Sequence, residues 1–314
     1  MKILMVGNKE SGKTTYMAST FGQLASGIEG FNIECDYSTR NWFEKLYQAV
    51  QNGKYPVASD KRDEFFFKLS CFGKNVLDFS WIDYNGGVIR EMDADKLMTD
   101  IKECDGVMLF FDAVALRDNS ASTHQLRRIL TLLSKKLGEI EAPLFSVILV
   151  VTKTDLLCSM EEYTQAIAPL KSFLENVEGN DDVYARIVPV SCTSRGFYNA
   201  ELPLLDILDS GLKISYLMAA YQCQQHAKKA VDYNNRRGIG DWVFSKLFGA
   251  PTNGELAESE LASALAQKQL FESIEGPMER LSTYVQDFVV KMPWDMAKST
   301  QSTQGNAGRR LIRF

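Results

Sequence analysis

The chain of 314 residues lacks several features that would decide its class at once. No apolar run reaches the roughly 20 residues that a membrane-spanning helix needs, and the short run after Met1-Lys2 does not have the layout of a signal peptide. The charge is mildly acidic, with 35 Lys and Arg against 40 Asp and Glu, so there is no basic excess of the kind that predicts a nucleic-acid partner. These absences favour a cytoplasmic protein without a transmembrane segment, and they disfavour nucleic acid as its partner.

Cysteine and histidine are also scarce. The six cysteines are scattered without a CxxC pair, which favours buried thiols over disulfides or a zinc site. The two histidines, His124 and His226, both fall in helical stretches, and we interpret them as surface or packing residues.

Apolar runs alternate with helical patterns through the first two-thirds of the chain. Strands are predicted at residues 2–6, 64–72, 75–83, 106–111, 144–151 and 186–190. Only residues 73 and 74 separate the second and third runs, which predicts a hairpin. The other connections are long enough for crossover helices, which predicts parallel strands. Helices are expected near 13–26, 41–51, 87–103, 121–138, 159–176 and 201–232. The predicted fold class is α/β, with a mostly parallel six-stranded sheet, one antiparallel edge strand and helices on both faces.

The strand signal stops after about residue 235. A short aromatic helix at 242–248 precedes a longer helical region at 255–291, which Gly276-Pro277 is expected to break or kink. Residues 295–314 are rich in small polar residues, a composition typical of disordered tails. We therefore expect a domain at 1–235, a helical extension at 236–294 and a disordered tail at 295–314.

The leucines at 204, 208 and 212 predict that helix 201–232 covers the sheet. Two further features of this region have two interpretations each. The aromatic segment 242–248 either docks on the rest of the chain or anchors a partner or a membrane surface. The basic and apolar end at 309–314 is either a solvated terminus or a contact for a partner or acidic lipid.

The clearest motif follows the first predicted strand. Gly7-Asn8-Lys9-Glu10-Ser11-Gly12-Lys13-Thr14 fits GxxxxGK[ST], the phosphate loop, and it lies between a strand and a helix as that motif requires. In such a loop, backbone N–H groups point at phosphate oxygens and the following helix N-terminus adds positive potential. We expect Lys13 to reach the β- and γ-phosphates, Thr14 to bind Mg²⁺ and Thr15 to touch the α-phosphate. The sequence therefore predicts a nucleoside triphosphatase.

Three shorter motifs stand at the ends of later strands: Asp83-Tyr84-Asn85-Gly86, Thr152-Lys153-Thr154-Asp155 and Ser191-Cys192-Thr193. With the phosphate loop, their order and spacing resemble the TRAFAC-type, Ras-like small GTPases over about residues 1–200. The short segment 53–59 is also similar to the region before the switch threonine in bacterial GTPase domains of conflict and defence loci.

The resemblance implies a role for each motif. Asp83 would hold Mg²⁺ through water, and the N–H of Gly86 would sense the γ-phosphate. Asp155 would accept hydrogen bonds from the N1–H and amino group of guanine, which adenine cannot offer, while Lys153 packs its stem against the base. The N–H of Cys192 would donate to guanine O6. Thr193 stands where the family has a lysine, which leaves the packing on the second face of the base open.

The switch and the catalytic step depart from the family pattern. Ser59 is the expected switch residue that contacts magnesium, with Thr39 as the alternative. Gly87 stands where Ras-like proteins place the glutamine that orients the attacking water. Hydrolysis is therefore slow, uses another group such as Glu91 or Arg90, or borrows one from a partner. Lys9 either adds positive charge at the γ-phosphate or points to solvent.

The sequence as a whole predicts a Mg²⁺-dependent molecular switch that binds and hydrolyses GTP, with GTP or GDP and Mg²⁺ as ligands. It would signal to a protein partner through its switch loops and C-terminal helices. The predicted catalytic residues are Lys13, Ser59 and Gly86, and the predicted metal ligands are Thr14, Asp83 and Ser59. The predicted nucleotide-binding residues are Gly7, Lys9, Glu10, Ser11, Gly12, Lys13, Thr14, Thr15, Thr152, Lys153, Asp155, Ser191, Cys192 and Thr193. The alternatives are a GTP-binding interaction module that hydrolyses slowly or not at all, and an ATPase.

Overall fold

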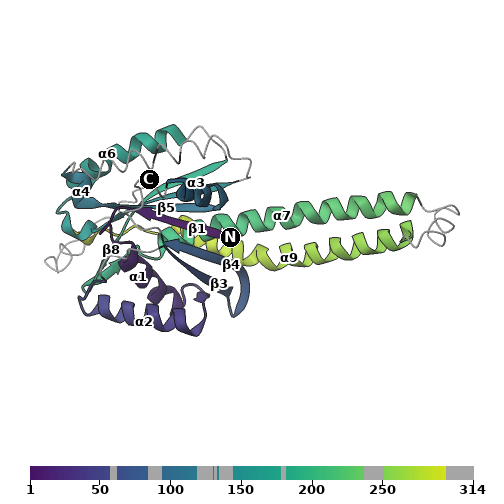
Figure 1. Cartoon of the computed structure of the whole chain (residues 1–314), viewed down its shortest axis with the longest axis horizontal. Helices are drawn as coiled ribbons and strands as arrows, with labels where there is room; N and C mark the ends of the chain where they lie inside the picture. Colours follow the sequence, from purple (N-terminus) through teal and green to yellow (C-terminus); the bar gives the residue numbers. More distant parts are fainter. Residues whose placement is uncertain are drawn as a thin grey trace, which may run out of the picture. The chain divides into compact units, whose positions relative to one another are not determined.

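The computed structural model describes residues 1–56, 62–83, 94–118, 130, 133, 144–177, 182–236 and 251–294 (Figure 1). Contacts divide the chain into two compact units. The first contains residues 1–210 and the described part of 283–314, and the second is Gly211–Ser282. Helix α7 (Leu202–Asn235) begins in the first unit and ends in the second.

A seven-stranded sheet forms the centre of the first unit, in the order β2-β3-β4-β1-β5-β6-β7. The strands are β1 (Lys2–Gly7), β2 (Phe31–Glu34), β3 (Asp63–Cys71), β4 (Lys74–Asp83), β5 (Gly106–Asp112), β6 (Phe145–Thr152) and β7 (Val183–Pro189). β3 pairs antiparallel with β2 and with β4, whereas the other neighbouring strands pair in parallel. The predicted α/β fold with a mostly parallel sheet is confirmed. The strand β2, which is not among the predicted strands, adds a seventh member outside the predicted hairpin.

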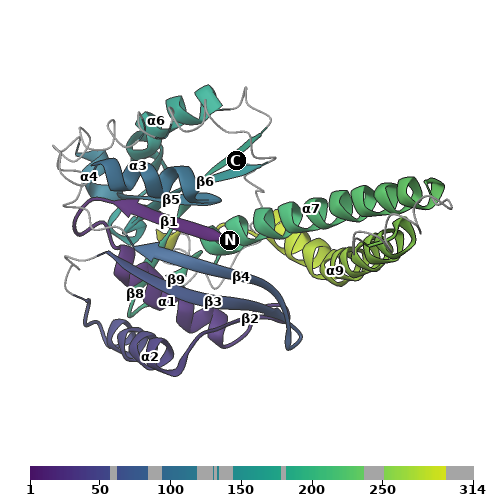
Figure 2. The same cartoon turned by 45° about the vertical axis from the view of Figure 1, so that its right-hand side comes forward.

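Helices cover both faces of this sheet (Figures 1 and 2). They are α1 (Lys13–Ala25) and α2 (Tyr37–Gln51) on one face, and α3 (Ala94–Glu103), α4 (Ala113–Arg117) and α6 (Met160–Val177) on the other. On the α1 side, the ring of Phe43 lies 4.9 Å from that of Phe21 and 5.8 Å from that of Phe67, which joins both helices to β3. Such aromatic contacts add specific geometry to the burial of a large apolar area.

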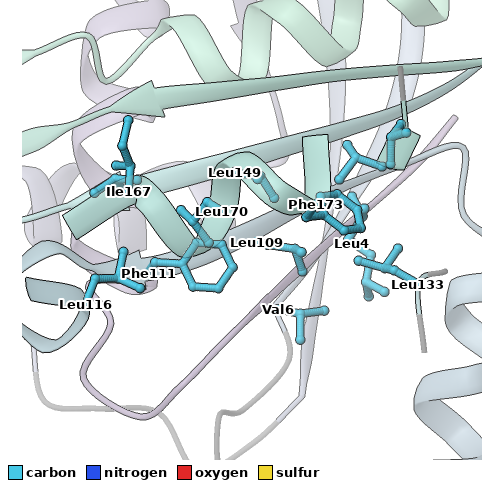
Figure 3. Packing of buried hydrophobic residues seen from close by; sticks show 14 of the residues in the cluster. Leu4, Val6, Leu109, Phe111, Leu116, Leu133, Leu149, Ile167, Leu170 and Phe173 are labelled. Atoms are coloured by element: carbon cyan, nitrogen blue, oxygen red, sulfur yellow. The ribbon is translucent and has the colours of Figure 1, made fainter. Parts of the chain in front are cut away.

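A hydrophobic cluster fills the space between the sheet and the helices α3, α4 and α6. Figure 3 shows Leu109 and Phe111 of β5 and Leu149 of β6 packed with Ile167 and Leu170 of α6. Every residue of β6 is buried, and only the last residue of β5 is partly exposed. Strands covered on both faces need apolar side chains at successive positions, which explains the unbroken runs in the sequence.

The region after β7 ties the C-terminal end of α9 (Asn253–Asp287) to the first unit. A small two-stranded sheet of β8 (Ser191–Thr193) and β9 (Gly196–Tyr198) leads into the buried Asn199. The side-chain amide of Asn199 donates to the carbonyls of Pro189 and Lys291, each at 2.8 Å, and its oxygen accepts from the N–H of Lys291 at 2.9 Å. The returning chain is therefore held next to the end of β7.

The second unit is an antiparallel helical hairpin of α7 and α9, which lie side by side in both views (Figures 1 and 2). On each helix, one series of buried or partly buried positions recurs at alternating spacings of three and four residues, the pattern of a coiled coil. The series is Leu212, Tyr216, Ala219, Cys223, His226 and Ala230 on α7, and Ala257, Glu260, Ala264, Gln267, Phe271 and Ile274 on α9. The pairs Tyr216–Phe271, with ring centroids 5.8 Å apart, and His226–Glu260, at 2.6 Å between Nδ1 and Oε2, fix the register.

The predicted break at Gly276-Pro277 is wrong, because α9 continues through these residues to Asp287. The alternative, a kink at this point, stays a prediction. Buried contacts on either side, at Ile274 and Leu281, offset the lost N–H donor of the proline. Helix α7 begins on the sheet, since a Cβ at Gly106 of β5 would lie 3.0 Å from the side chain of Ile207, and its residues from Gly211 onward belong to the second unit.

Some predicted features lie outside the described residues. These are most of helix 121–138, the first part of helix 87–103, the aromatic segment 242–248 and the tail 295–314. No described helix combines the length and apolarity that crossing a bilayer would require.

Candidate functional site

The loop between β1 and α1 has the backbone of an anion-binding turn. Glu10 and Gly12 have φ angles of 65° and 84°, both in the left-handed region, which turns neighbouring N–H groups toward one side. A Cβ at Gly7 would stand 2.7 Å from the Cβ of Phe110. Only glycine therefore lets the loop leave the sheet this close to β5. The loop then runs into the N-terminus of α1, whose positive potential favours phosphate.

Lys13, the first residue of α1, holds its ammonium group inside this loop. Its side chain is only 8% exposed, and Nζ donates to the carbonyls of Gly7 at 2.9 Å and Asn8 at 3.2 Å. Burial lowers the pKa of Lys13, while the negative charge of Asp83 raises it. Because a buried cation is costly without compensating charge, an anionic ligand would be strongly favoured here.

A cavity of about 440 Å³ opens in front of the loop. It lies at the carboxyl ends of the parallel strands, where open α/β sheets bind their ligands. Its volume is within the usual range for a small-molecule site. The lining residues are Lys9, Glu10, Ser11, Gly12, Lys13, Thr14, Thr15, Tyr16, Tyr55, Pro56, Asp83, Thr152, Lys153, Asp155, Leu156, Val190, Cys192 and Thr193.

Asp83, the last residue of β4, faces this cavity. It is 4% exposed, and among the described residues its Oδ1 atom has no hydrogen-bond partner. Burial raises the pKa of Asp83 to about 6, against an opposing effect of the nearby Lys13 charge. A buried carboxylate oxygen without a partner, in the same cavity as the hydroxyl of Thr14, fits Mg²⁺, which prefers oxygen ligands.

The other end of the cavity carries the carboxylate of Asp155, which lies in a short 3-10 helix, η2 (Thr154–Leu156), after β6. One oxygen of Asp155 accepts a hydrogen bond from Ser191 Oγ at 2.7 Å. Ser191 is fully buried, so it does not line the cavity but orients the carboxylate that does. The hydroxyl of Thr152 lies 2.7 Å from the carbonyl of Ser11 and donates to it, which ties this end of the site to the phosphate loop.

Lys153 also lines the cavity, and its ammonium group is held by Asp112. Its φ angle is 57°, and its Nζ lies 2.6 Å from Oδ2 of Asp112 at the end of β5. The other oxygen of Asp112 accepts from the N–H groups of Val114 and Ala115, which caps α4. One carboxylate therefore fixes both a helix start and the position of Lys153.

Cys192 and Thr193 reach the cavity from the β8–β9 hairpin. Burial raises the pKa of the Cys192 thiol to about 12, so it is neutral at physiological pH. The hydroxyl of Thr193 accepts from the N–H of Arg195 at 3.2 Å within the hairpin turn. The side chain of Thr193 is therefore used to shape the turn.

The structure thus brings most predicted site residues to one cavity. Gly7 and Ser191 lie behind the lining, as described above, and the exposed Lys9 lies at the edge. Thr39 lies in the first turn of α2, where its N–H donates to Asp36, and it does not line the cavity. Ser59 and Gly86 lie outside the described residues, as do Gly87, Arg90 and Glu91.

Sequence reasoning missed several contributors to the site. Tyr55 and Pro56 line the cavity from the connection after α2, Tyr16, Leu156 and Val190 also line it, and Asp112 holds Lys153. The position of Asp112 at the end of a predicted buried strand is a signal that could have identified it, because the carboxyl ends of parallel strands share one edge. Tyr55 carries no such local signal.

A family model described as Double-GTPase 2 matches residues 3–180. Two solved structures are similar to the chain. One is the signal recognition particle receptor SRb-GTP/SRX complex from Chaetomium thermophilum, with 12% identity and a TM-score of 0.38, covering 61% of this chain and 90% of that chain. The other is the mammalian SRP receptor, with 14% identity and a TM-score of 0.37, covering 66% of this chain and all of that chain. Neither likeness identifies what this chain binds. No curated protein matches it.

Proposed function

This chain belongs to the Double-GTPase 2 family and carries a P-loop GTPase domain, and we propose that it is a Mg²⁺-dependent molecular switch that signals to a protein partner. The observation that carries the proposal is the shared cavity. It holds the buried ammonium of Lys13, the buried carboxylate of Asp83 and the oriented carboxylate of Asp155. The first two suit a metal-bound polyphosphate, and the third suits the hydrogen-bond donors of guanine.

At the phosphate end, Lys13 would exchange its carbonyl partners for oxygens of the β- and γ-phosphates. The ammonium group of Lys13 already donates to the carbonyls of Gly7 and Asn8, so it lies at the loop without a ligand. Asp83 and Thr14 would hold the metal ion, which when bound neutralises charge on the phosphate oxygens. The N–H of Gly86 and the hydroxyl of Ser59 are proposed to complete the γ-phosphate side.

At the base end, Asp155 has one oxygen bonded to Ser191. It would accept from the N1–H and amino group of guanine. Adenine would leave the carboxylate without these donors, a penalty that makes such sites selective. The N–H of Cys192 is proposed to donate to guanine O6.

The sequence at the switch favours slow or partner-activated hydrolysis, because Gly87 has no side chain with which to orient water. The same observation supports a second candidate, a GTP-binding module that hydrolyses little. In either case the γ-phosphate would hold Ser59 and the Asp83–Gly86 segment together, and its loss would release them.

The proposal also covers the cellular compartment of the protein and the partner that it signals to. We propose a cytoplasmic protein whose C-terminal helices pass the nucleotide state to another protein. The narrower kinship with GTPases of bacterial defence loci rests on segment 53–59 alone and stays a prediction, as does weak contact of segment 242–248 or the basic end with a membrane surface.

Phosphate release from purified protein tests the proposal. We expect release from GTP that needs Mg²⁺, exceeds release from ATP and is lost in Lys13→Ala. Binding of GTP without measurable release would support the interaction module. Equal release from ATP and GTP would contradict the role of Asp155, and absence of guanine-nucleotide binding would end both candidates.

A further inference from the structure

The helical hairpin of α7 and α9 buries small side chains and exposes larger ones (Figure 2). Ala219 and Ala230 on α7 and Ala257 and Ala264 on α9 are buried in the seam between the helices, each at most 8% exposed. Since burial of large apolar side chains stabilises helix packing, this distribution indicates that a further surface covers some of those outside. The larger apolar side chains outside the seam are between 44% and 58% exposed, and they are Leu217, Met218, Tyr221, Val231, Leu261, Leu265 and Leu270.

Heptad positions place four of these side chains on one flank of the hairpin. The seam residues Tyr216 and Phe271, whose ring centroids are 5.8 Å apart, both occupy position a. In an antiparallel pair of helices, positions e and b of both helices lie on one flank, and positions g and c lie on the other. We call the flank of positions e and b the leucine face. Its apolar members are Leu217, Ala220, Ala227 and Val231 on α7, and Leu261 and Leu265 on α9.

The opposite flank is mostly polar. It carries Met218 and Leu270 beside Gln222, Lys229 and Asp232 on α7 and Ser259, Ala266 and Ser273 on α9. The leucine face therefore has the longer exposed apolar stripe of the two flanks. Such a stripe is typical of a surface that contacts another protein.

The leucine face is large enough for a specific contact between proteins. At about 1.5 Å per residue, α7 is about 36 Å long from Gly211 to Asn235, and two helices side by side are about 20 Å wide. The face therefore offers about 700 Å² per chain, or about 1,400 Å² in a symmetric pair, which is within the range of specific interfaces. Interfaces of this size have affinities that are micromolar or tighter.

The charges of the two helices indicate what covers this face. Between Gly211 and Asn235, α7 carries three lysines against one aspartate. Between Asn253 and Ser282, α9 carries six glutamates against one lysine and one arginine. One helix is therefore basic and the other acidic, so the hairpin is complementary in charge to a second copy of itself.

Charge also selects the orientation of the two copies. A closed dimer has a two-fold axis, and two orientations of that axis bring the leucine faces together. An axis across the helices sets α7 on α7 and α9 on α9, which brings like charges together. An axis parallel to the helices sets α7 of each copy on α9 of the other, which brings opposite charges together. The second orientation is therefore favoured.

We propose that the leucine face binds a second copy of this chain, so that two hairpins form an antiparallel four-helix bundle with α7 of each copy on α9 of the other. This inference rests on the hairpin alone and not on the proposed function. In the bundle, Lys228 approaches Glu258 of the second copy. Lys228 follows His226 by two residues and Glu258 precedes Glu260 by two, so the contact of His226 with Glu260 sets both at the same height.

Sedimentation velocity of the full chain without nucleotide tests the proposal, over about 1 to 100 µM, the range in which a micromolar contact forms. We expect the wild type to change from monomer to dimer. The double variant Leu261→Glu with Leu265→Glu should stay monomeric, because the contact would bury carboxylates without partners. The matched control is Leu270→Glu, at a position of similar exposure on the opposite flank of the same helix, which should dimerise as the wild type does. Unchanged melting temperatures at low concentration show that the variants are folded.

Reversal of the charges at Lys228 and Glu258 tests the orientation. Lys228→Glu or Glu258→Lys alone should weaken the dimer about 5-fold or more, because each change makes two attractive contacts of the symmetric pair repulsive. The two changes together restore opposite charges and should return the affinity to that of the wild type.

Three results would overturn the proposal. A wild type that stays monomeric at the highest concentration would show that a second copy does not cover the leucine face. A dimer that persists in the Leu261→Glu and Leu265→Glu variant, or that Leu270→Glu weakens as much, would show that the contact lies elsewhere on the chain. Single charge reversals without effect, or a double reversal that does not restore the dimer, would refute the packing of α7 on α9 of the second copy.

Discussion

At neutral pH, the buried carboxylate of Asp83 should lower the free energy of unfolding of the ligand-free protein. The change is Asp83→Asn, which keeps the shape of the side chain and removes its charge. Asp83 is 4% exposed, and burial raises its pKa from 3.8 to about 6. One pKa unit corresponds to about 1.4 kcal/mol. The raised pKa therefore means that ionising Asp83 in the folded state costs about 3 kcal/mol above pH 6.

The direction of the pH dependence follows from this raised pKa. The folded protein holds this proton more tightly than the unfolded chain, so the contribution of Asp83 to stability is greatest below about pH 4 and is lost as the pH rises to about 6. Asparagine has no such titration. The attraction of the Lys13 charge is already part of this raised pKa, so the gain in unfolding free energy at pH 7.5 should approach about 3 kcal/mol.

The assay is urea denaturation of both proteins from pH 4 to 8, without nucleotide. Other buried acids such as Asp206, whose pKa burial also raises to about 6, are present in both proteins and cancel in the difference. Addition of Mg²⁺ and GDP should stabilise the wild type and leave Asp83→Asn nearly unchanged. A difference between the proteins that stays flat from pH 4 to 7, or a variant less stable than wild type at pH 7.5, would show that Asp83 carries no such penalty.

Three further substitutions test other parts of the structure. Asp112→Ala removes the cap of α4 and the partner of Lys153, so denaturation should show a loss of about 1 kcal/mol and calorimetry a several-fold weaker binding of GDP. Asn199→Ala leaves the N–H and carbonyl of Lys291 without their partner and should lower the unfolding free energy by about 2 kcal/mol. Leu149→Ala opens the centre of β6, which is fully buried, and should cost about 2–5 kcal/mol in the same assay.

Two of these have a matched control. Asp112→Asn keeps an oxygen for the cap but loses the ion pair, so it should lower GDP affinity with little loss of stability. GDP binding by Asp112→Asn as tight as that of the wild type would show that the ion pair does not position Lys153. Leu261→Ala, at a site 52% exposed, should cost well under 1 kcal/mol. If Leu149→Ala lowered the unfolding free energy no more than Leu261→Ala does, the packing described for β6 would be contradicted.

The parts of the fold that could be predicted are those whose constraints are local. The strands β5 and β6 are unbroken apolar runs in the sequence, and the phosphate loop needs particular residues at fixed spacing. The four-residue β2 was missed because a short edge strand carries little pattern of its own and forms by pairing with β3. The hairpin β8–β9 is of the same kind, with strands of three residues.

The rest depends on contacts that are distant in the sequence. Pro277 predicts a broken helix on local grounds, yet α9 continues because Ile274 and Leu281 are buried on either side. Asp112 and Lys153 are 41 residues apart, and only the pairing of β5 with β6 brings them together. Tyr55 reaches the cavity through the packing of α2 against a hairpin that lies far downstream in the sequence, which no local pattern reveals.

The choice of base by Asp155 can be measured by equilibrium binding of guanine, xanthine and adenine nucleotides, with Mg²⁺, to the wild type and to Asp155→Asn. We expect the wild type to prefer GDP over ADP and XDP. Asp155→Asn should lose GDP and gain XDP, whose C2 oxygen accepts a hydrogen bond from the new amide. If the wild type bound ADP as tightly as GDP, or if Asp155→Asn left the order of preference unchanged, the carboxylate of Asp155 would not choose the base and the protein would not be the guanine-specific switch proposed here.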